Sequence, residues 1–166
     1  MLCKDCYTKF MKLISLTQGQ SAKVDDEDFA RFGHLKWCAQ WHKKEKVFYA
    51  VRKNNKKILL LHREILGLTD PRIKGDHINH DTLDCQSRNL RPATNAQNTR
   101  NKKGANSTSK TGIRGVWWVE NRKKFSAGIQ VDGKSKHLGY FSDTVSASSA
   151  YAAANHKYFG AFGGQL

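Results

Sequence analysis

Four polar residues in the middle of the chain have types and spacing that could hydrolyse a phosphodiester bond. Asp76 and His77 are adjacent, Asn89 follows His77 by twelve residues, and Asn98 follows nine residues later. A histidine titrates near neutral pH, so His77 suits the base that deprotonates a water nucleophile. Asp and Asn offer hard oxygen ligands, which suit Mg²⁺ (or Mn²⁺) and not zinc. The set predicts metal-dependent hydrolysis in which one cation stabilises the leaving 3′ oxygen.

The adjacency of Asp76 and His77 constrains the backbone that carries them. Neighbours on a regular strand point to opposite faces, so a strand must end or bend here for both to face one site. A helix is expected to begin after Thr94, because Thr94 and Gln97 have capping-box spacing. Asn98 would lie in its first turn. Any one of these residues alone would fit a turn, a cap or a surface histidine, and only the set indicates chemistry.

The sequence around these residues resembles a known class of nuclease. The resemblance rests on residues 75–81 (GDHINHD), 88–91 (RNLR) and 95–98 (NAQN). These segments resemble the HNH (ββα-metal) endonucleases of phage and homing type. The resemblance implies that Asp76 and Asn98 bind the metal and that His77 is the general base. It also implies that Asn89 holds the His77 ring through a backbone or imidazole contact.

Other polar residues near the set give weaker signals. His62 and Arg63 form a pair that is also similar to the family pattern before the site. Arg63 could contact a phosphate or form a salt bridge at a helix start. His80 could reach a metal or a phosphate, and Cys85 has no role that this reaction requires. The possible phosphate contacts are Arg63, Arg100, Lys102 and Lys103.

The C-terminal third predicts three strands followed by a helix. The strands are expected over residues 112–119, 124–131 and 135–141. Asp132-Gly133 predicts a type I′ hairpin, because that turn needs positive φ at both central residues. Ser142 or Asp143 would cap a helix that runs to about Phe159, with Gly160 closing it. The helix face that packs on the sheet would comprise Ala147, Tyr151, Ala154 and Tyr158.

This region resembles the APETALA/ethylene-response-factor domain, through residues 113–118 (IRGVWW), 125–129 (FSAGI) and 137–141 (HLGYF). The resemblance implies a three-stranded sheet that lies in the DNA major groove with a helix behind it. The implied DNA-binding residues are Arg114, Trp117, Val119, Arg122, Lys124, Gln130, Lys134, Lys136 and His137. Four of them, Trp117, Val119, Gln130 and His137, fall where plant members more often carry Arg or Trp. The alternative is that Trp117, Trp118 and Phe125 are core or hairpin aromatics. This must be partly true of one of the two tryptophans, because neighbours on a strand point to opposite faces.

The first part of the chain reads as β-rich. Strands are expected around residues 13–16, 47–51 and 57–61, and Phe29, Phe32 and Leu35 keep helical spacing after the acidic run at residues 25–28. The order of the segments resembles phage and bacterial proteins in which an HNH nuclease precedes such a domain. We expect the N-terminal part to pack on the nuclease site and to add DNA contacts.

The whole chain is therefore expected to be α+β. Its expected domains are an N-terminal extension (1–11), an HNH nuclease domain (12–103), a small polar linker (104–111) and a DNA-binding domain (112–166). The chain has 29 Lys and Arg against 14 Asp and Glu, a net charge of +15. Such a charge favours a polyanionic partner, here double-stranded DNA. A cytoplasmic location is expected, because no apolar run has the length of a membrane span and no signal peptide is evident. A monomer is expected as well, because no obligate protein partner is evident.

The cysteines do not predict a metal centre. Cys3 and Cys6 have metal-ligand spacing, but a structural zinc site normally needs a second such pair, so no structural zinc is expected. The functional prediction is a metal-dependent DNA endonuclease of homing type, and a nick and a double-strand break fit the sequence equally. Two alternatives stay open: a non-cleaving, sequence-specific DNA-binding regulator and an RNA-binding protein.

Overall fold

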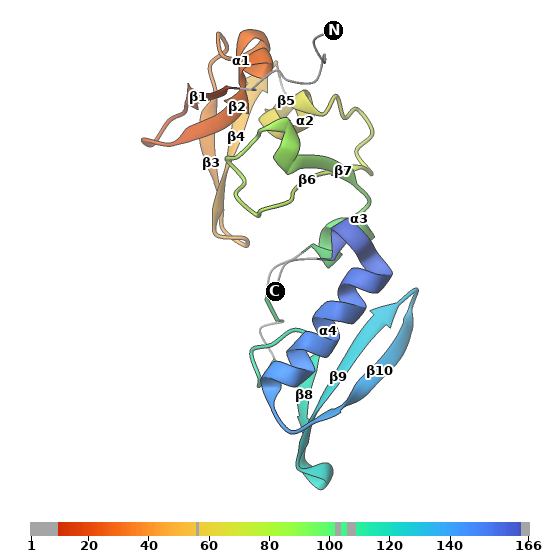
Figure 1. Cartoon of the computed structure of the whole chain (residues 1–166). Helices are drawn as coiled ribbons and strands as arrows, with labels where there is room; N and C mark the ends of the chain where they lie inside the picture. Colours follow the sequence, from red (N-terminus) through yellow and green to blue (C-terminus); the bar gives the residue numbers. More distant parts are fainter. Residues whose placement is uncertain (1–9, 56, 102–103, 106–108, 164–166) are drawn as a thin grey trace, which may run out of the picture. The chain divides into compact units, whose positions relative to one another are not determined.

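The structure is a computed structural model of residues 1–166, and it describes residues 10–55, 57–101, 104–105 and 109–163 (Figure 1). The chain forms two compact units that divide between Asn95 and Ala96. Each unit combines small antiparallel sheets with helices, so the predicted α+β class is confirmed. Cys3, Cys6, Lys102 and Lys103 lie outside the described residues, as does most of the expected N-terminal extension. No helix in the described ranges is long and apolar enough to cross a membrane.

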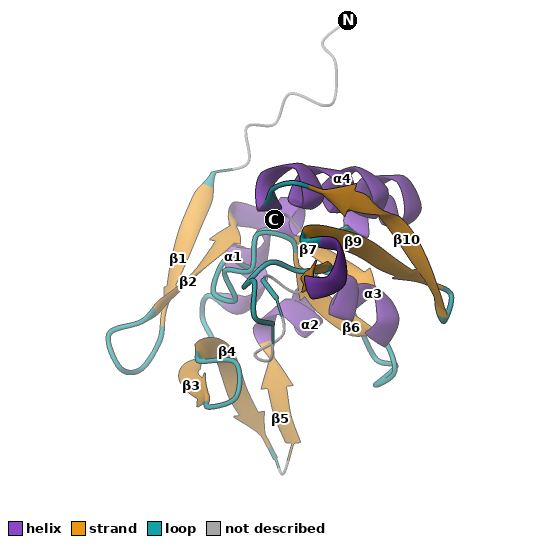
Figure 2. Ribbon diagram, turned by 90° about the horizontal axis from the view of Figure 1, so that it is seen from below, coloured by secondary structure: helices purple, strands orange, loops and turns teal. Residues whose placement is uncertain are grey.

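The first unit is built from three small antiparallel sheets, which pair β1 with β2, β3 with β4 and β5, and β6 with β7. Its elements in chain order are β1 (Met11–Ser15), β2 (Ser21–Asp25), α1 (Asp26–Phe32), β3 (Cys38–His42), β4 (Val47–Asn54), β5 (Lys57–Leu60), α2 (Leu61–Ile65), β6 (Lys74–His77), the 3₁₀ turn η1 (Ser87–Asn89) and β7 (Leu90–Ala93). The β-rich prediction for this part is confirmed. Figure 2 shows β1 beside β2, and the short helix α2.

The core of this unit lies between the N-terminal hairpin, β4 and the segment around β7. Its buried members are Ile14, Ala22, Val24, Phe32, Trp37, Ala50, Leu61, Cys85 and Leu90. Helix α1 ends at Phe32, one turn earlier than the apolar spacing predicts, and Leu35 donates its N–H to the Phe32 carbonyl in the turn that follows. The indole of Trp37 also donates to that carbonyl at 3.0 Å, which closes the helix end inside the core.

The N-terminal hairpin packs on the loop that joins β6 to β7. Lys23 accepts the N–H of Cys85 and donates its own N–H to Leu83, each at 2.8 Å. The Asp25 carboxylate is buried and accepts the N–H of Ser87 at 3.0 Å, at the start of η1. The predicted packing of the N-terminal part on the segment with the candidate catalytic residues is confirmed.

The second unit is a three-stranded antiparallel sheet, in the order β10-β9-β8, with α4 across one face (Figure 1). Its elements are α3 (Asn95–Arg100), β8 (Val116–Val119), the 3₁₀ turn η2 (Glu120–Arg122), β9 (Lys124–Val131), β10 (Lys134–Phe141), α4 (Thr144–Phe159) and the 3₁₀ turn η3 (Gly160–Phe162). Its cores join the sheet to the helix through Val116, Ala127 and Ala147, and through Ile129, Tyr151 and Ala154. Three strands and a backing helix were predicted, and the structure has them.

The turn and the helix cap that the sequence predicts for this unit are present in the structure. Asp132 (φ 49°) and Gly133 (φ 77°) are both left-handed, which gives the type I′ turn between β9 and β10. The Asp143 carboxylate caps α4 by accepting the N–H of Ser146 at 2.7 Å. Strand β8 is shorter than predicted and begins at Val116, because Gly112 and Gly115 adopt positive φ.

Gly115 offers a test of the packing between sheet and helix. A Cβ at this position would lie 2.1 Å from Cδ2 of Tyr151 and 2.8 Å from the Gly128 carbonyl, whereas a Cβ at Gly112 meets nothing within 4 Å. Both glycines have positive φ, so Gly112→Ala controls for the strain of that conformation. Gly115→Ala should lower the free energy of unfolding by about 1–3 kcal/mol more than Gly112→Ala, as overpacking does. Urea denaturation measures the difference, and equal losses would contradict the close packing of Tyr151.

Candidate functional site

Asp76 and His77 lie at the end of β6 and are both buried, with 4% and 6% of their surfaces exposed. In the hairpin, Asp76 stands opposite Arg91 and His77 opposite Leu90. His77 is the last residue of the strand, so β6 ends where the sequence predicts a strand end or bend.

The Asp76 carboxylate is paired with an arginine that sequence reasoning did not select. Nε of Arg91 donates to Oδ2 of Asp76 at 2.7 Å, and the two side chains are only 13% and 5% exposed. A carboxylate removed from water needs such a charge-assisted hydrogen bond. The signal for this pair was available only from the hairpin register, which sets residues 76 and 91 opposite each other.

Asn89 closes the loop that follows His77. Its Oδ1 accepts the N–H of Asn79 at 2.9 Å, and its Nδ2 donates to the Asp84 carbonyl at 2.7 Å. The Asn89 carbonyl also accepts the N–H of Ile78 at 2.9 Å. Asn89 thereby fixes the backbone directly after His77. That Asn89 also holds the His77 ring stays a prediction.

The His77 ring is enclosed by three side chains from separate parts of the unit. The ring centroid of His62 lies 4.8 Å away, edge to face, and that of Tyr49 lies 6.4 Å away. On another side, Sγ of Cys85 is 3.9 Å from Nε2 of His77. His62 can approach because Gly75 has no side chain: a Cβ there would lie 2.4 Å from Cδ2 of His62. Sequence reasoning left the role of His62 open and missed Tyr49, which lies 28 positions before His77 in the sequence.

Burial sets the protonation of this cluster. It lowers the pKa of His77 to about 4, although the charges of Asp76, Asp81 and Asp84 act in the opposite direction. Burial also lowers the pKa of His62 to about 3, with the neighbouring His77 and Arg63 adding to the effect. For Cys85, burial raises the pKa to about 12. At neutral pH both imidazoles are therefore neutral, the form in which a histidine can accept a proton, and the thiol is protonated.

The remaining residues predicted near this site have other surroundings. Asn98 is half-buried in the first turn of α3, which belongs to the second unit, so one unit brings together Asp76, His77 and Asn89 only. Arg63 donates to the carbonyls of Leu68, Asp70 and Ile73, and so shapes the turn that leads into β6. His80 has a left-handed backbone (φ 67°) and donates its N–H to the His77 carbonyl at 3.1 Å.

In the second unit, α4 leaves one face of the sheet uncovered, and we call this the open face. The register places on it Trp117, Val119, Lys124, Ser126, Gly128, Gln130, Ser135, His137 and Tyr140. Five of these were predicted to contact DNA, and Arg122 joins them because its guanidinium lies 4.6 Å from the Tyr140 ring centroid. Tyr140 was missed. The bulge between His137 and Gly139 turns it to this face, and no sequence pattern announces that bulge.

Four other predicted contact residues of this unit lie elsewhere. Lys134 and Lys136 stand opposite Val131 and Ile129, on the face that α4 covers. Nζ of Lys136 is 5.2 Å from the Tyr158 ring of that helix. Arg114 donates to the carbonyls of Arg100 (3.0 Å) and Thr99 (3.4 Å) at the end of α3. The Arg100 guanidinium itself lies 4.3 Å from the Phe159 ring centroid.

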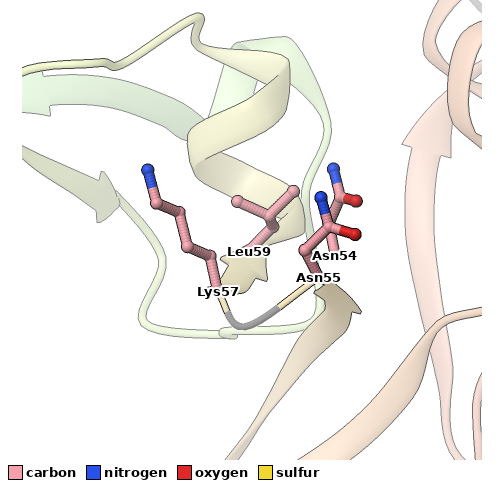
Figure 3. Close-up of a pocket in the computed structure, with 4 residues that line it drawn as sticks. All are labelled: Asn54, Asn55, Lys57 and Leu59. Carbon is pink, nitrogen blue, oxygen red and sulfur yellow. The ribbon is translucent and has the colours of Figure 1, made fainter.

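The described surface hollows do not coincide with the His77 cluster. A cavity of about 540 Å³ lies at the β4–β5 turn and is lined by Asn54, Asn55, Lys57 and Leu59 (Figure 3). The described residues that line it include neither a carboxylate nor an imidazole. Among the described residues no group of three or more His, Cys, Asp or Glu side chains is arranged to hold a metal ion.

Comparisons of the chain with protein-family models, with curated proteins and with solved structures find no match.

The Asp76–Arg91 pair predicts the effect of removing one partner. Arg91→Met leaves a buried carboxylate without its cation and should lower the free energy of unfolding by about 3–5 kcal/mol. Asp76→Asn in the same chain should restore much of that loss. Arg72→Met is the matched control, because Arg72 pairs with Asp70 at the surface, where its side chain is 88% exposed, and should change stability little. Urea denaturation of the four proteins checks this, and equal losses in the two single arginine variants would refute it.

The depressed histidine pKa values predict a dependence of stability on pH. In the unfolded chain each imidazole binds a proton near pH 6.5, but in the folded chain only near pH 4 (His77) or 3 (His62). The unfolded state therefore binds more protons between these values, and stability falls as the pH is lowered from about 6.5 towards 4. Each histidine contributes a slope of about 1.4 kcal/mol per pH unit. His62→Phe should reduce the measured slope by one such contribution, and an unchanged slope would contradict a buried, neutral His62.

Proposed function

We propose that this chain is a metal-dependent DNA endonuclease of the HNH type, in which β6, β7 and α3 form a ββα-metal core. The observation that carries the proposal is the buried Asp76–His77 pair at the end of β6, with Asn89 holding the loop behind it. A satisfied surface histidine would not need this enclosure. A neutral imidazole beside a carboxylate is the arrangement that proton abstraction from water requires.

His77 is the proposed general base. Its ring is held between His62, Tyr49 and Cys85, so its orientation is fixed before substrate arrives. The neutral imidazole takes a proton from the attacking water as the water oxygen adds to phosphorus. Asn89 acts through the backbone of residues 78 and 79, which keeps the end of β6 in place under the ring.

Asp76 and Asn98 are the proposed metal ligands. A carboxylate and an amide oxygen are hard donors, and a Mg²⁺ site needs few protein ligands because waters and phosphate oxygens supply the rest. The donor set fits that ion, or Mn²⁺, better than a softer metal that prefers thiolates. When bound, the ion stabilises negative charge on the phosphate and on the leaving 3′ oxygen. Nε of Arg91 also contacts Oδ2 of Asp76 and balances its charge.

The proposed substrate is double-stranded DNA, held by the open face of the second unit. The net charge of +15 supports a polyanionic partner, and the major groove admits a β-ribbon. Arg122 and Lys124 lie at one end of this face and suit phosphate contacts. Action as a monomeric homing-type enzyme belongs to the same proposal.

A non-cleaving DNA-binding regulator is the second candidate, and one observation favours it. Oδ2 of the proposed ligand Asp76 already accepts a hydrogen bond from Arg91, and the His77 ring is nearly buried. Such a protein would keep the open face and use the β6–β7 hairpin only as a structural element. The two candidates differ in a single measurable property, the cleavage of DNA.

Incubation of supercoiled plasmid with the full chain and Mg²⁺ or Mn²⁺ tests the proposal. The wild type should cleave the plasmid, EDTA should stop cleavage, and His77→Ala should slow it by roughly 10²–10⁴-fold. The affinity of His77→Ala for DNA in EDTA should equal that of the wild type, because the base acts on water. His34→Ala, an exposed histidine in the same unit, is the matched control and should cleave normally.

Asn98→Ala extends the test to the metal, because Asn98 is only half-buried and its loss should leave the fold intact. This variant should need a higher Mg²⁺ concentration for half-maximal cleavage than the wild type. Cleavage that persists in EDTA, or a His77→Ala protein that cuts within a few-fold of wild type, would overturn the mechanism. A wild type that binds DNA but never cuts it would favour the regulator.

A further inference from the structure

The open face of the β8-β9-β10 sheet has a centre that is aromatic and apolar. Trp117 and Tyr140 are 46% and 41% exposed, although they are large hydrophobic side chains on a small sheet. Between them Ser126 is only 1% exposed, because it stands opposite both in the register and its hydroxyl lies 3.0 Å from Nε2 of His137. The centre of the open face thus carries two exposed aromatic rings, Trp117 and Tyr140.

Gly128 determines how Trp117 lies on this surface. A Cβ at residue 128 would be 2.8 Å from Cη2 of the indole, so the ring reaches across β9 and rests against the glycine backbone. Val119, two residues further along β8, is on the same face and half-exposed. Together Trp117 and Val119 form a low apolar platform along one side of the face.

The cations of the unit do not occupy this centre. All strand positions of the sheet are described, and none on the open face is an arginine. Arg114 is directed to the carbonyls at the end of α3, and Arg122 lies over the Tyr140 ring, at 4.6 Å from its centroid. The polar groups at the other end of the face are the amide of Gln130 and the hydroxyl of Ser135, which stand opposite each other.

Apart from Lys124, which lies at one end of the open face, these side chains match one kind of base pair. In the major groove, guanine is read by the paired donors of Arg or Lys, adenine by the amide of Gln or Asn, and thymine by apolar contact with its 5-methyl group. We infer that the open face reads A·T base pairs, with Trp117 and Val119 contacting thymine methyl groups and Gln130 bonding to adenine. This inference rests on the proposed function, because it assumes that the face meets duplex DNA.

Exposed aromatic rings could instead stack on the bases of a single strand. The geometry of the Tyr140 ring disfavours that use. The Arg122 guanidinium lies over the ring, and the His137 ring is 4.5 Å away at an interplanar angle of 52°. A base could not stack on Tyr140 without displacing one of these partners, whereas groove contact needs only the exposed edges.

The test begins with selection of random-sequence duplexes by the full chain in EDTA, which prevents cleavage, followed by sequencing. The selected core should be rich in A·T pairs. The best duplex is then compared with one in which deoxyuridine replaces thymidine, a change that removes only the methyl groups. Loss of each buried methyl group should weaken binding about fourfold.

Variants attribute the effect to the open face. Trp117→Ala should reduce the difference in affinity between the thymidine and deoxyuridine duplexes, and Gln130→Leu should lose the preference for adenine at one position. Val145→Thr, on a residue of α4 that is 73% exposed, is the matched control and should keep both preferences. Circular dichroism checks that the sheet is intact, and Val119→Thr is a milder second variant that should reduce the methyl effect if Trp117→Ala unfolds.

The outcomes separate the inference from the proposed function. Selection of G·C-rich cores, duplex binding without base preference, or equal affinity for the two duplexes would overturn the inference and leave the proposed function standing. Tighter binding to single strands than to duplexes would overturn the inference in favour of stacking. Failure to bind any duplex at low salt would overturn both.

Discussion

The ion pair between Asp76 and Arg91 is the interaction on which the first unit depends. Moving a carboxylate from water into a protein interior costs several kcal/mol unless a cation and hydrogen bonds offset it. Arg91 can offset this cost only if β7 pairs with β6 in the one register that brings residues 76 and 91 opposite each other. The loop of residues 78–89 must then return the chain from His77 to Leu90 in a single conformation. Asn89, at the end of this loop, bonds to its start at Ile78 and Asn79 and to its middle at Asp84. The N-terminal hairpin bonds to the second half of the loop through Lys23 and Asp25.

The side chains that we propose to be functional have opposite surroundings in the two units. In the first, His77 is enclosed by rings and a thiol, so its protonation and orientation are set by the protein before any partner binds. In the second, Trp117 and Tyr140 are left exposed on a sheet that α4 already stabilises from behind. Chemistry needs a group whose surroundings are fixed, whereas recognition needs a surface that stays open until its partner arrives.

The sequence predicted the parts of the structure that local signals control. The Asp132-Gly133 turn, the Asp143 cap and the strand end at His77 follow from backbone preferences and from spacing, and the structure has all three. It could not predict contacts that depend on register or on distant segments. Arg91 and Tyr140 were missed because only strand pairing and a bulge place them. His62 was left without a role, since its approach to His77 depends on the missing side chain of Gly75.

Arg114 is of a residue type that suits DNA contacts, but in the structure it contacts the end of a helix. From the sequence, an arginine near the start of the first predicted strand of this unit was expected to contact a phosphate or a base. In the structure its guanidinium meets the carbonyls of Thr99 and Arg100, the negative end of a short helix. Nothing in the sequence distinguishes the two uses, because α3 and Arg114 are separated by a segment without a regular pattern.

The contacts that hold helix α3 limit where recombination could join a different C-terminal module to such a chain. A helix of six residues is marginal by itself, and here Arg114 at its end and the Arg100–Phe159 contact hold it within the second unit. Recombination that joined a foreign C-terminal module at the small polar segment of residues 104–111 would separate this helix from the side chains that hold it. A viable exchange would need its junction before Asn95, so Asn98 would be inherited with the module that follows it and not with Asp76 and His77.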